Sequence, residues 1–357
     1  MSAYFNPDLL RVARQARGLS QEELHALSGV SQGTISKLES GNAEPAPGVL
    51  DKLGQALRYP SSLFAESDRV VGLPISVHPL YRKRASVGQR PLAQLEADMN
   101  LRLLQIRRLL RSLEFRAELE LPRMDVEDYD NPEQIAEFVR RTWMIPNGPL
   151  RNLVEVVERA GCIVVPSDFD GRSVDGVTQR APGLPPCIFL NRNMPADRQR
   201  FTLAHEIGHI VMHRVPTPNL EQEANAFASA LLMPARDIRP SLTGGLSLAR
   251  LGALKLEWRV SMGALAMRAK QLGAITEYQS RQLWTRTLAR YRTKEPGQFD
   301  FPAEAPSILV AMVRYHTGEL GFNPAQLGRL MHLYEEEVRT LYGLGATAPG
   351  AGLRIVR

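Results

Sequence analysis

Two histidines and a glutamate, His205, Glu206 and His209, stand at fixed spacing in the apolar run 201–213. No proline interrupts this run, so we expect a buried helix. Residues four apart share one helix face, which lets both imidazoles bind one ion with Glu206 beside them. Zinc suits such ligands, and Glu206 could take a proton from a zinc-activated water. The alternative is a pair of histidines hydrogen-bonded inside a core.

A third metal ligand is expected from the next predicted helix, which begins near residue 220 and is closed by Pro234. An antiparallel pair of helices would place Glu221 over the two histidines. Glu223, two residues further along the same helix, is the alternative ligand. If Glu221 binds, the Glu223 side chain should point elsewhere.

His213 follows His209 by four residues and falls on the same helix face. Along a helix it lies about 12 Å from His205, at 1.5 Å per residue. Three such histidines cannot reach one ion unless the helix ends between them. A carboxylate is therefore the better third ligand.

The stretch 201–234 resembles the ImmA/IrrE family of zinc metallopeptidases. Two motifs carry the resemblance: Arg200-Phe201-Thr202-Leu203-Ala204-His205-Glu206-Ile207-Gly208-His209, and Glu221-x-x-Ala224-Asn225-x-Phe227-Ala228 before Leu232-Met233-Pro234. The resemblance implies Zn²⁺ on His205 and His209, Glu206 as general base and Glu221 as third ligand.

Length and composition favour a multidomain globular protein. The chain has 357 residues, 44% of them hydrophobic and 23% charged. Its two cysteines, Cys162 and Cys187, stand in strand-like apolar contexts, so we expect buried free thiols in a reducing compartment. We see no signal peptide and no run long enough to span a bilayer, so we expect a cytoplasmic protein with no membrane partner. The net charge of +6 permits nucleic-acid binding.

Residues 6–64 are predicted to form a helical domain of four or five helices. Ser20 and Glu23 form a capping box at the start of the second helix. A tight turn at Gly29 leads to a third helix over 32–40. Helix, short glycine-containing turn and helix is the helix-turn-helix arrangement.

This domain resembles the Xre/Cro helix-turn-helix family through Leu19-Ser20-Gln21-Glu22-Glu23-Leu24 and Val30-Ser31-Gln32-Gly33-Thr34-Ile35-Ser36-Lys37-Leu38-Glu39-Ser40-Gly41. The resemblance implies a double-stranded DNA operator, read by the N-terminal residues of the third helix. We expect base contacts from Gln32, Thr34 and Ser36, help from Gln21 and Ser31, and phosphate contacts from Arg14, Arg17, Lys37 and Asn42.

A homodimer on a palindromic operator is expected, with half-sites about 34 Å apart. The alternative is a helical module that binds protein, which the charge of the domain favours slightly. Residues 1–66 hold 6 basic and 7 acidic side chains.

Residues 67–131 are predicted to form a basic linker and a long amphipathic helix. The linker includes the basic run 82–84, and residues 67–116 hold 10 basic and 4 acidic side chains. Apolar residues then recur at spacings of three and four, at Leu92, Leu95, Met99, Leu103, Ile106, Leu110 and Leu113. This heptad-like stripe is either a dimer seam or a face packed inside the chain.

Residues 132–291 are predicted to form the α+β zincin-like domain. Helices are expected over 132–144 and 150–160, before strands over 162–165, 174–179 and 187–190 in a small antiparallel sheet. Residues 292–357 form a helical C-terminal region of unknown role. The fold class is mainly α, with residues 1–66 as the DNA-binding domain.

The sequence thus favours a DNA-binding transcriptional regulator with a zinc-dependent metallo-endopeptidase domain. Its substrate would be a regulatory protein, either a repressor or the chain itself. The alternative is a non-catalytic transcription factor whose zincin domain senses a ligand or stress. Glu206 favours hydrolysis, since a purely structural zinc site needs no general base.

Overall fold

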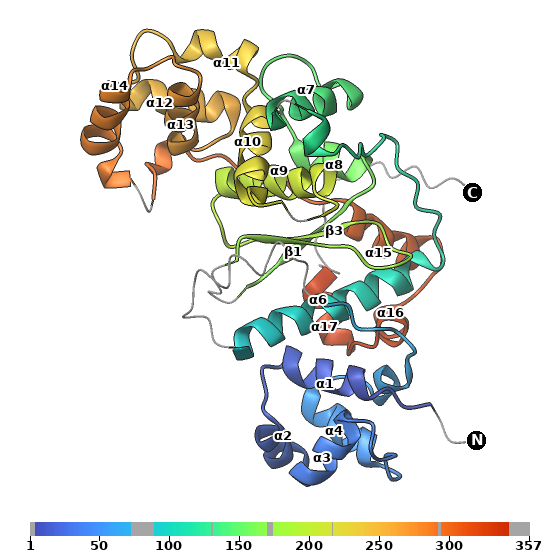
Figure 1. Cartoon of the computed structure of the whole chain (residues 1–357). Helices are drawn as coiled ribbons and strands as arrows, with labels where there is room; N and C mark the ends of the chain where they lie inside the picture. Colours follow the sequence, from blue (N-terminus) through green and yellow to red (C-terminus); the bar gives the residue numbers. More distant parts are fainter. Residues whose placement is uncertain are drawn as a thin grey trace. The chain divides into compact units, whose positions relative to one another are not determined.

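The computed structural model describes residues 4–72, 89–129, 131–169, 174–215, 217–291 and 294–342. The basic run 82–84 lies outside these residues. The chain divides into two compact units (Figure 1). The first comprises Met1–Phe115, Arg180–Leu184 and Ser307–Arg357, and the second comprises Arg116–Gln179 and Pro185–Pro306.

The first unit begins with the expected helix-turn-helix domain. Its helices are α1 (Pro7–Ala16), α2 (Gln21–Ser28), α3 (Gln32–Glu39), α4 (Val49–Leu57) and the 3₁₀ turn η1 (Ser61–Ala65). The predicted capping box forms, because Ser20 Oγ accepts from Glu23 N and the Glu23 carboxylate accepts from Ser20 N. Gly29 ends α2 at a φ of 70°, which glycine adopts without strain. Ser31 then caps α3 by accepting from Thr34 N.

The long helix α6 (Gln89–Leu110) belongs to this same unit, together with α15 (Ile308–Gly318), α16 (Pro324–Met331) and α17 (Glu335–Tyr342). It packs against α1, α15 and α16. Most of its heptad-like stripe is core, since Leu95, Met99, Leu103 and Ile106 are at most 2% exposed. Packing inside the chain, and not a free dimer seam, therefore accounts for the stripe.

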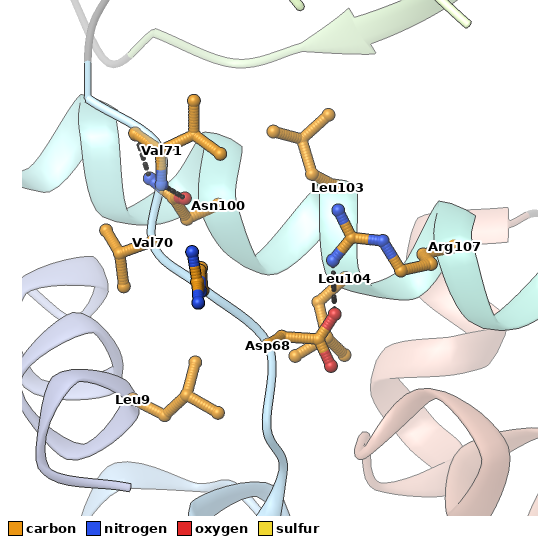
Figure 2. Close-up of a pocket in the computed structure, with 9 residues that line it drawn as sticks. Leu9, Asp68, Val70, Val71, Asn100, Leu103, Leu104 and Arg107 are labelled. Atoms are coloured by element: carbon orange, nitrogen blue, oxygen red, sulfur yellow. Dashed lines mark hydrogen bonds and ion pairs between the residues drawn. The ribbon is translucent and has the colours of Figure 1, made fainter. Parts of the chain in front are cut away.

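The segment that leaves the helix-turn-helix domain is held against α6 (Figure 2). The Asn100 side chain accepts from Val71 N at 2.7 Å and donates to Val71 O at 2.9 Å. Asp68 forms ion pairs with Arg107 and Arg108. Residues 66–71 are thus a fixed part of the first unit and not a free linker.

The sheet of the second unit contains β1 (Ile163–Ser167), β2 (Gly176–Gln179) and β3 (Cys187–Asn191) in the order β1-β3-β2. The expectation of an antiparallel sheet was wrong for one pair. β2 and β3 form an antiparallel hairpin, but β1 pairs parallel with β3. The reason is that β2 lies at the far edge of the sheet. The chain turns back from β2 into β3, and β3 then lies between β2 and β1 and runs in the same direction as β1.

The second unit also contains helices, some of which pack on this sheet while others complete the core. They are α7 (Pro132–Thr142), α8 (Leu153–Arg159), α9 (Ala196–Met212), α10 (Leu220–Leu232), α11 (Ala235–Leu242), α12 (Leu248–Trp258), α13 (Met262–Gln271) and α14 (Glu277–Gln282), with short turns at η2 (Val126–Asp128), η3 (Leu283–Thr287), η4 (Ala289–Tyr291) and η5 (Gly297–Phe299). α8 packs on β1, and α9 packs on β2 and β3. Cys162 and Cys187 are both buried, and neither forms a disulfide. Within the described ranges, no helix has the length and apolar character needed to cross a bilayer.

Candidate functional site

The helices α9 and α10 form a close antiparallel hairpin that positions the candidate metal ligands. His205 contacts Asn225, and His209, four residues later, contacts Glu221, four residues earlier than Asn225. The two helices therefore run in opposite directions. Gly208 permits this approach. A Cβ there would stand 3.1 Å from Phe227 Cδ1 and 3.3 Å from the Ala224 Cα, closer than side chains normally pack.

His205, His209 and Glu221 come together as the metal-site prediction requires. The two Nε2 atoms lie 2.9 Å apart, and Glu221 oxygens lie 3.4 Å from His205 Nε2 and 3.6 Å from His209 Nε2. Tetrahedral zinc ligands at about 2.0–2.1 Å from the ion stand roughly 3.3–3.4 Å from one another. The two Glu221 separations lie close to this spacing, and the two imidazoles would have to move apart slightly to hold one zinc ion.

The donor chemistry of this cluster also fits a cation. Glu221 Oε1 is buried and accepts no hydrogen bond from any described residue. Burial, aided by the neighbouring His205 and His213 rings, lowers the pKa of His209 to about 2. His209 is thus a neutral imidazole, the form that binds metals. Across the described part of the chain, this is the one group of three or more His, Cys, Asp or Glu side chains whose ligand atoms are spaced to hold a metal.

Glu206 lies beside the cluster and is held from the sheet. It is 5% exposed, and Thr178 Oγ1 of β2 donates to Glu206 Oε2 at 2.7 Å. Burial raises the pKa of the Glu206 carboxyl, although the His205 charge and the Thr178 hydrogen bond act to lower it. A carboxyl with a raised pKa is suited to exchange protons near neutral pH.

His213 lies behind His209 and outside the ligand cluster. Helix α9 ends at Met212, so His213 is its C-cap. His213 Nδ1 lies 2.9 Å from His209 Nδ1, the ring nitrogen opposite the one that faces Glu221. His213 therefore contacts a candidate ligand rather than the metal position.

Glu223 points away from the metal position, as expected if Glu221 binds. Glu223 Oε2 lies 3.0 Å from His213 Nε2 and accepts from Thr217 Oγ1 at 2.6 Å. A chain of contacts thus runs from His209 through His213 to Glu223. Such outer contacts orient the ligands of metal sites.

Two side chains around this cluster escaped the sequence analysis as partners of the site. Asn225 Oδ1 lies 3.0 Å from His205 Nδ1, which orients that ring. Thr178 holds Glu206 from a strand far away in the sequence. The position of Asn225, one turn after Glu221, was a usable signal, but a threonine in a short strand carried none.

In the helix-turn-helix domain, α3 presents several predicted base readers to solvent. Ser31, Gln32 and Lys37 are exposed, and Thr34 and Ser36 are partly so. Ser31 Oγ and Thr34 Oγ1 lie 2.8 Å apart at the N-terminus of the helix. These polar side chains occupy the end of the helix that meets base edges in this motif.

Gln21 and Arg14 take part in a polar chain inside the domain. Gln32 Nε2 donates to Gln21 Oε1 at 3.1 Å, and Gln21 Nε2 donates to Glu39 Oε2 at 2.9 Å. Arg14 pairs with both Glu39 oxygens, at 2.6 and 2.8 Å, and donates to Leu19 O at 2.7 Å. These contacts bind Arg14 to the scaffold and argue against the expected phosphate contact.

Arg17 is also bound to its own unit. It donates to Leu57 O at 2.7 Å and pairs with Glu337 of α17 at 2.7 Å. Its guanidinium stacks over the Tyr59 ring at 4.2 Å. Asn42, by contrast, is exposed and donates to the Ser40 hydroxyl at 2.9 Å. Lys37 and Asn42 are therefore better placed than the two arginines to contact phosphate.

Comparison with known proteins assigns both regions to families. Residues 157–270 match the IrrE N-terminal-like domain of peptidase family M78, and residues 10–64 match a helix-turn-helix family. An uncharacterized HTH-type transcriptional regulator, y4dL of Sinorhizobium fredii, is 48% identical over 48 residues, which cover 13% of this chain and 24% of that protein. The uncharacterized HTH-type transcriptional regulator RghRB of Bacillus subtilis is 37% identical over 67 residues, which cover 18% of this chain and 48% of that protein. The chain thus covers less than half the length of either relative.

Proposed function

The chain carries a helix-turn-helix domain joined to a domain of the IrrE metallopeptidase family, and from this premise we propose a DNA-binding regulator that hydrolyses a peptide bond in a regulatory protein. Both family resemblances predicted from the sequence are confirmed. The observation that carries the hydrolytic part is the buried Glu206 beside the three-ligand cluster. We place this activity in the cytoplasm.

His205, His209 and Glu221 would hold the metal, and their spacing suits zinc. A bound zinc ion supplies a Lewis acid that polarises the scissile carbonyl and lowers the pKa of water to about 7. His213 and Asn225 keep the two imidazoles oriented through the ring nitrogens that face away from the metal position.

Glu206 moves the proton in this mechanism. It takes a proton from the water that attacks the scissile carbonyl, and it then gives that proton to the leaving amine. Its raised pKa helps the second transfer, because a carboxyl that holds its proton more tightly persists as an acid until the amine accepts it. Thr178 holds the carboxylate in place during both transfers.

DNA binding is assigned to α3. Gln32, Thr34 and Ser36 would meet base edges, with Ser31 at the helix N-terminus, while Lys37 and Asn42 contact phosphate. Gln21 supports Gln32 from α2. We propose a homodimer on a palindromic operator. Since the α6 stripe is buried within one chain, another surface must form the dimer.

The peptidase substrate is proposed to be a separate protein, such as a repressor. The described part of the segment 117–131 is held in place, because Leu119 N donates to Arg159 O at 3.0 Å and Met124 N donates to Val211 O at 3.0 Å. A peptidase requires an extended, accessible segment, so these bonds would have to break before self-cleavage there.

Glu206→Gln tests the proposal, because it removes the base and keeps the shape of the side chain. The variant should retain zinc, fold and operator binding but lose cleavage. Target-promoter reporters and proteomes of cells carrying each form are compared under inducing conditions. If both forms respond alike and no protein fragment differs between them, the metal domain is a non-catalytic sensor.

A further inference from the structure

The second unit contains a cavity of about 600 Å³ beside the metal-ligand cluster. Its walls come from α9, α10, α12 and α13, and from six residues that follow them: Trp284, Leu288, Tyr291, Lys294, Glu295 and Asp300. The volume falls within the range of about 300–1,000 Å³ that is usual for small-molecule pockets. The proton-transfer mechanism above makes no use of this space.

One wall of the cavity is the helix pair α12–α13, whose connecting turn has the same caps as the α2–α3 turn. In this hairpin Arg259 ends the first helix at a φ of 54°, and Ser261 caps the second by accepting from Ala264 N at 3.0 Å. In the DNA-binding domain Gly29 and Ser31 do the same, with a φ of 70° and a bond of 3.2 Å to Thr34 N. The two turns therefore match residue by residue.

The exposed positions of the two hairpins differ in chemistry. Where α3 carries Thr34 and Lys37, α13 carries Ala264 and Met267, and both of these line the cavity. Apolar side chains cannot donate hydrogen bonds to bases or neutralise phosphates. This face of α13 therefore suits an apolar ligand and not DNA.

Most of the charged groups of the cavity wall are already paired, and the exposed Lys294 is the exception among its described lining residues. Lys255 Nζ lies 2.6 Å from Asp197 Oδ2 and 2.8 Å from Glu295 Oε2. Arg198 pairs with Asp175 at 2.6 Å. Most of the remaining surface is apolar and includes Trp284. A ligand here meets apolar walls with few charges left to neutralise.

We propose that this cavity binds an uncharged, mainly apolar small molecule, and that its occupancy is coupled to metal binding. Asn225 provides the coupling, because it lines the cavity and its Oδ1 lies 3.0 Å from His205 Nδ1. A ligand that moves Asn225 changes the orientation of His205. The coupling rests on the proposed metal site, whereas binding to the cavity does not.

The probe for the cavity is N-phenyl-1-naphthylamine, a neutral dye that fluoresces in apolar sites, added to the full chain without metal. Met267→Trp fills the cavity and should weaken dye binding at least tenfold. Leu256→Trp is the matched control, since Leu256 is 44% exposed and Met267 is 46% exposed, and Leu256 does not line the cavity. This control should bind dye as wild type does.

Ala264→Leu provides a second cavity variant if Met267→Trp fails to fold, and it should also weaken dye binding. No saturable dye binding, or equal binding by cavity and control variants, overturns the site. Because the assay contains neither metal nor peptide, a peptidase-inactive chain would still pass it.

The coupling is tested by measuring the dye affinity with and without zinc, and the zinc affinity with and without dye. Because coupling is reciprocal, the two affinities must change by the same factor. We expect at least a threefold change in wild type and none in Asn225→Ala. Equal affinities in wild type overturn the coupling.

Discussion

Removing the Glu223 side chain tests whether ligand orientation depends on the contacts behind His209. In Glu223→Ala, His213 Nε2 and the Thr217 hydroxyl lose the carboxylate oxygen that lies 3.0 and 2.6 Å from them. His213 is then free to turn, and it no longer fixes the ring of His209, whose Nδ1 lies 2.9 Å from it.

The expected loss follows from the position of Glu223 outside the ligand cluster. Removing an outer partner of a metal ligand typically costs about 10–100-fold in metal affinity, which corresponds to about 1.4–2.7 kcal/mol. Glu221→Ala deletes a candidate ligand atom and should cost more than Glu223→Ala. Glu223→Gln keeps one acceptor oxygen for His213 and should recover most of the loss.

The assay is competition for zinc between each variant and a chromophoric chelator, with circular dichroism to confirm that each variant is folded. The reasoning fails if Glu223→Ala binds zinc as tightly as wild type. It fails equally if Glu223→Ala loses all zinc while Glu221→Ala keeps it, because Glu223 would then be the third ligand.

Three further predictions concern stability and DNA binding. Lys255→Met should lower the free energy of unfolding of the second unit in urea by about 3–5 kcal/mol, because the Asp197 and Glu295 carboxylates lose the buried ammonium that pairs with them. A change below about 1 kcal/mol would contradict this. Gln32→Ala should relax base preference in a selection from random DNA. Lys37→Ala should weaken binding to all DNA sequences and reduce the slope of log affinity against log salt concentration by about 1. An unchanged base preference or an unchanged slope would count against these assignments. Arg14→Ala should lower the melting temperature more than Lys37→Ala does, because Arg14 is largely buried against Glu39; equal melting temperatures would return Arg14 to the candidate phosphate contacts.

The elements that local signals control were predictable from the sequence. The capping box at Ser20 and the turn at Gly29 set the ends of the first helices, and both form as expected. His205 and His209 share a helix face because of their spacing, and the short connection to α10 brings Glu221 over them. Each of these signals acts within a few turns of one helix or across one short loop.

Features that depend on distant packing were not predictable in the same way. The apolar stripe on α6 has the spacing of a dimer seam. A helix buried inside its own unit shows the same spacing, so the period alone did not distinguish the two alternatives. The parallel pairing of β1 with β3 depends on where β2 lies in the sheet, and no residue in the strands specifies that order. Thr178 reaches Glu206 only because α9 packs across β2.

The α12–α13 hairpin shows why backbone geometry alone does not assign function to such an element. It shares with α2–α3 a left-handed residue at the end of the first helix and a serine cap two residues later. Lys37 of α3 is exposed to solvent, whereas Met267 at the matching place lines an apolar cavity. The same turn can therefore present a reading surface or a ligand wall, and the side chains that follow the serine decide between them.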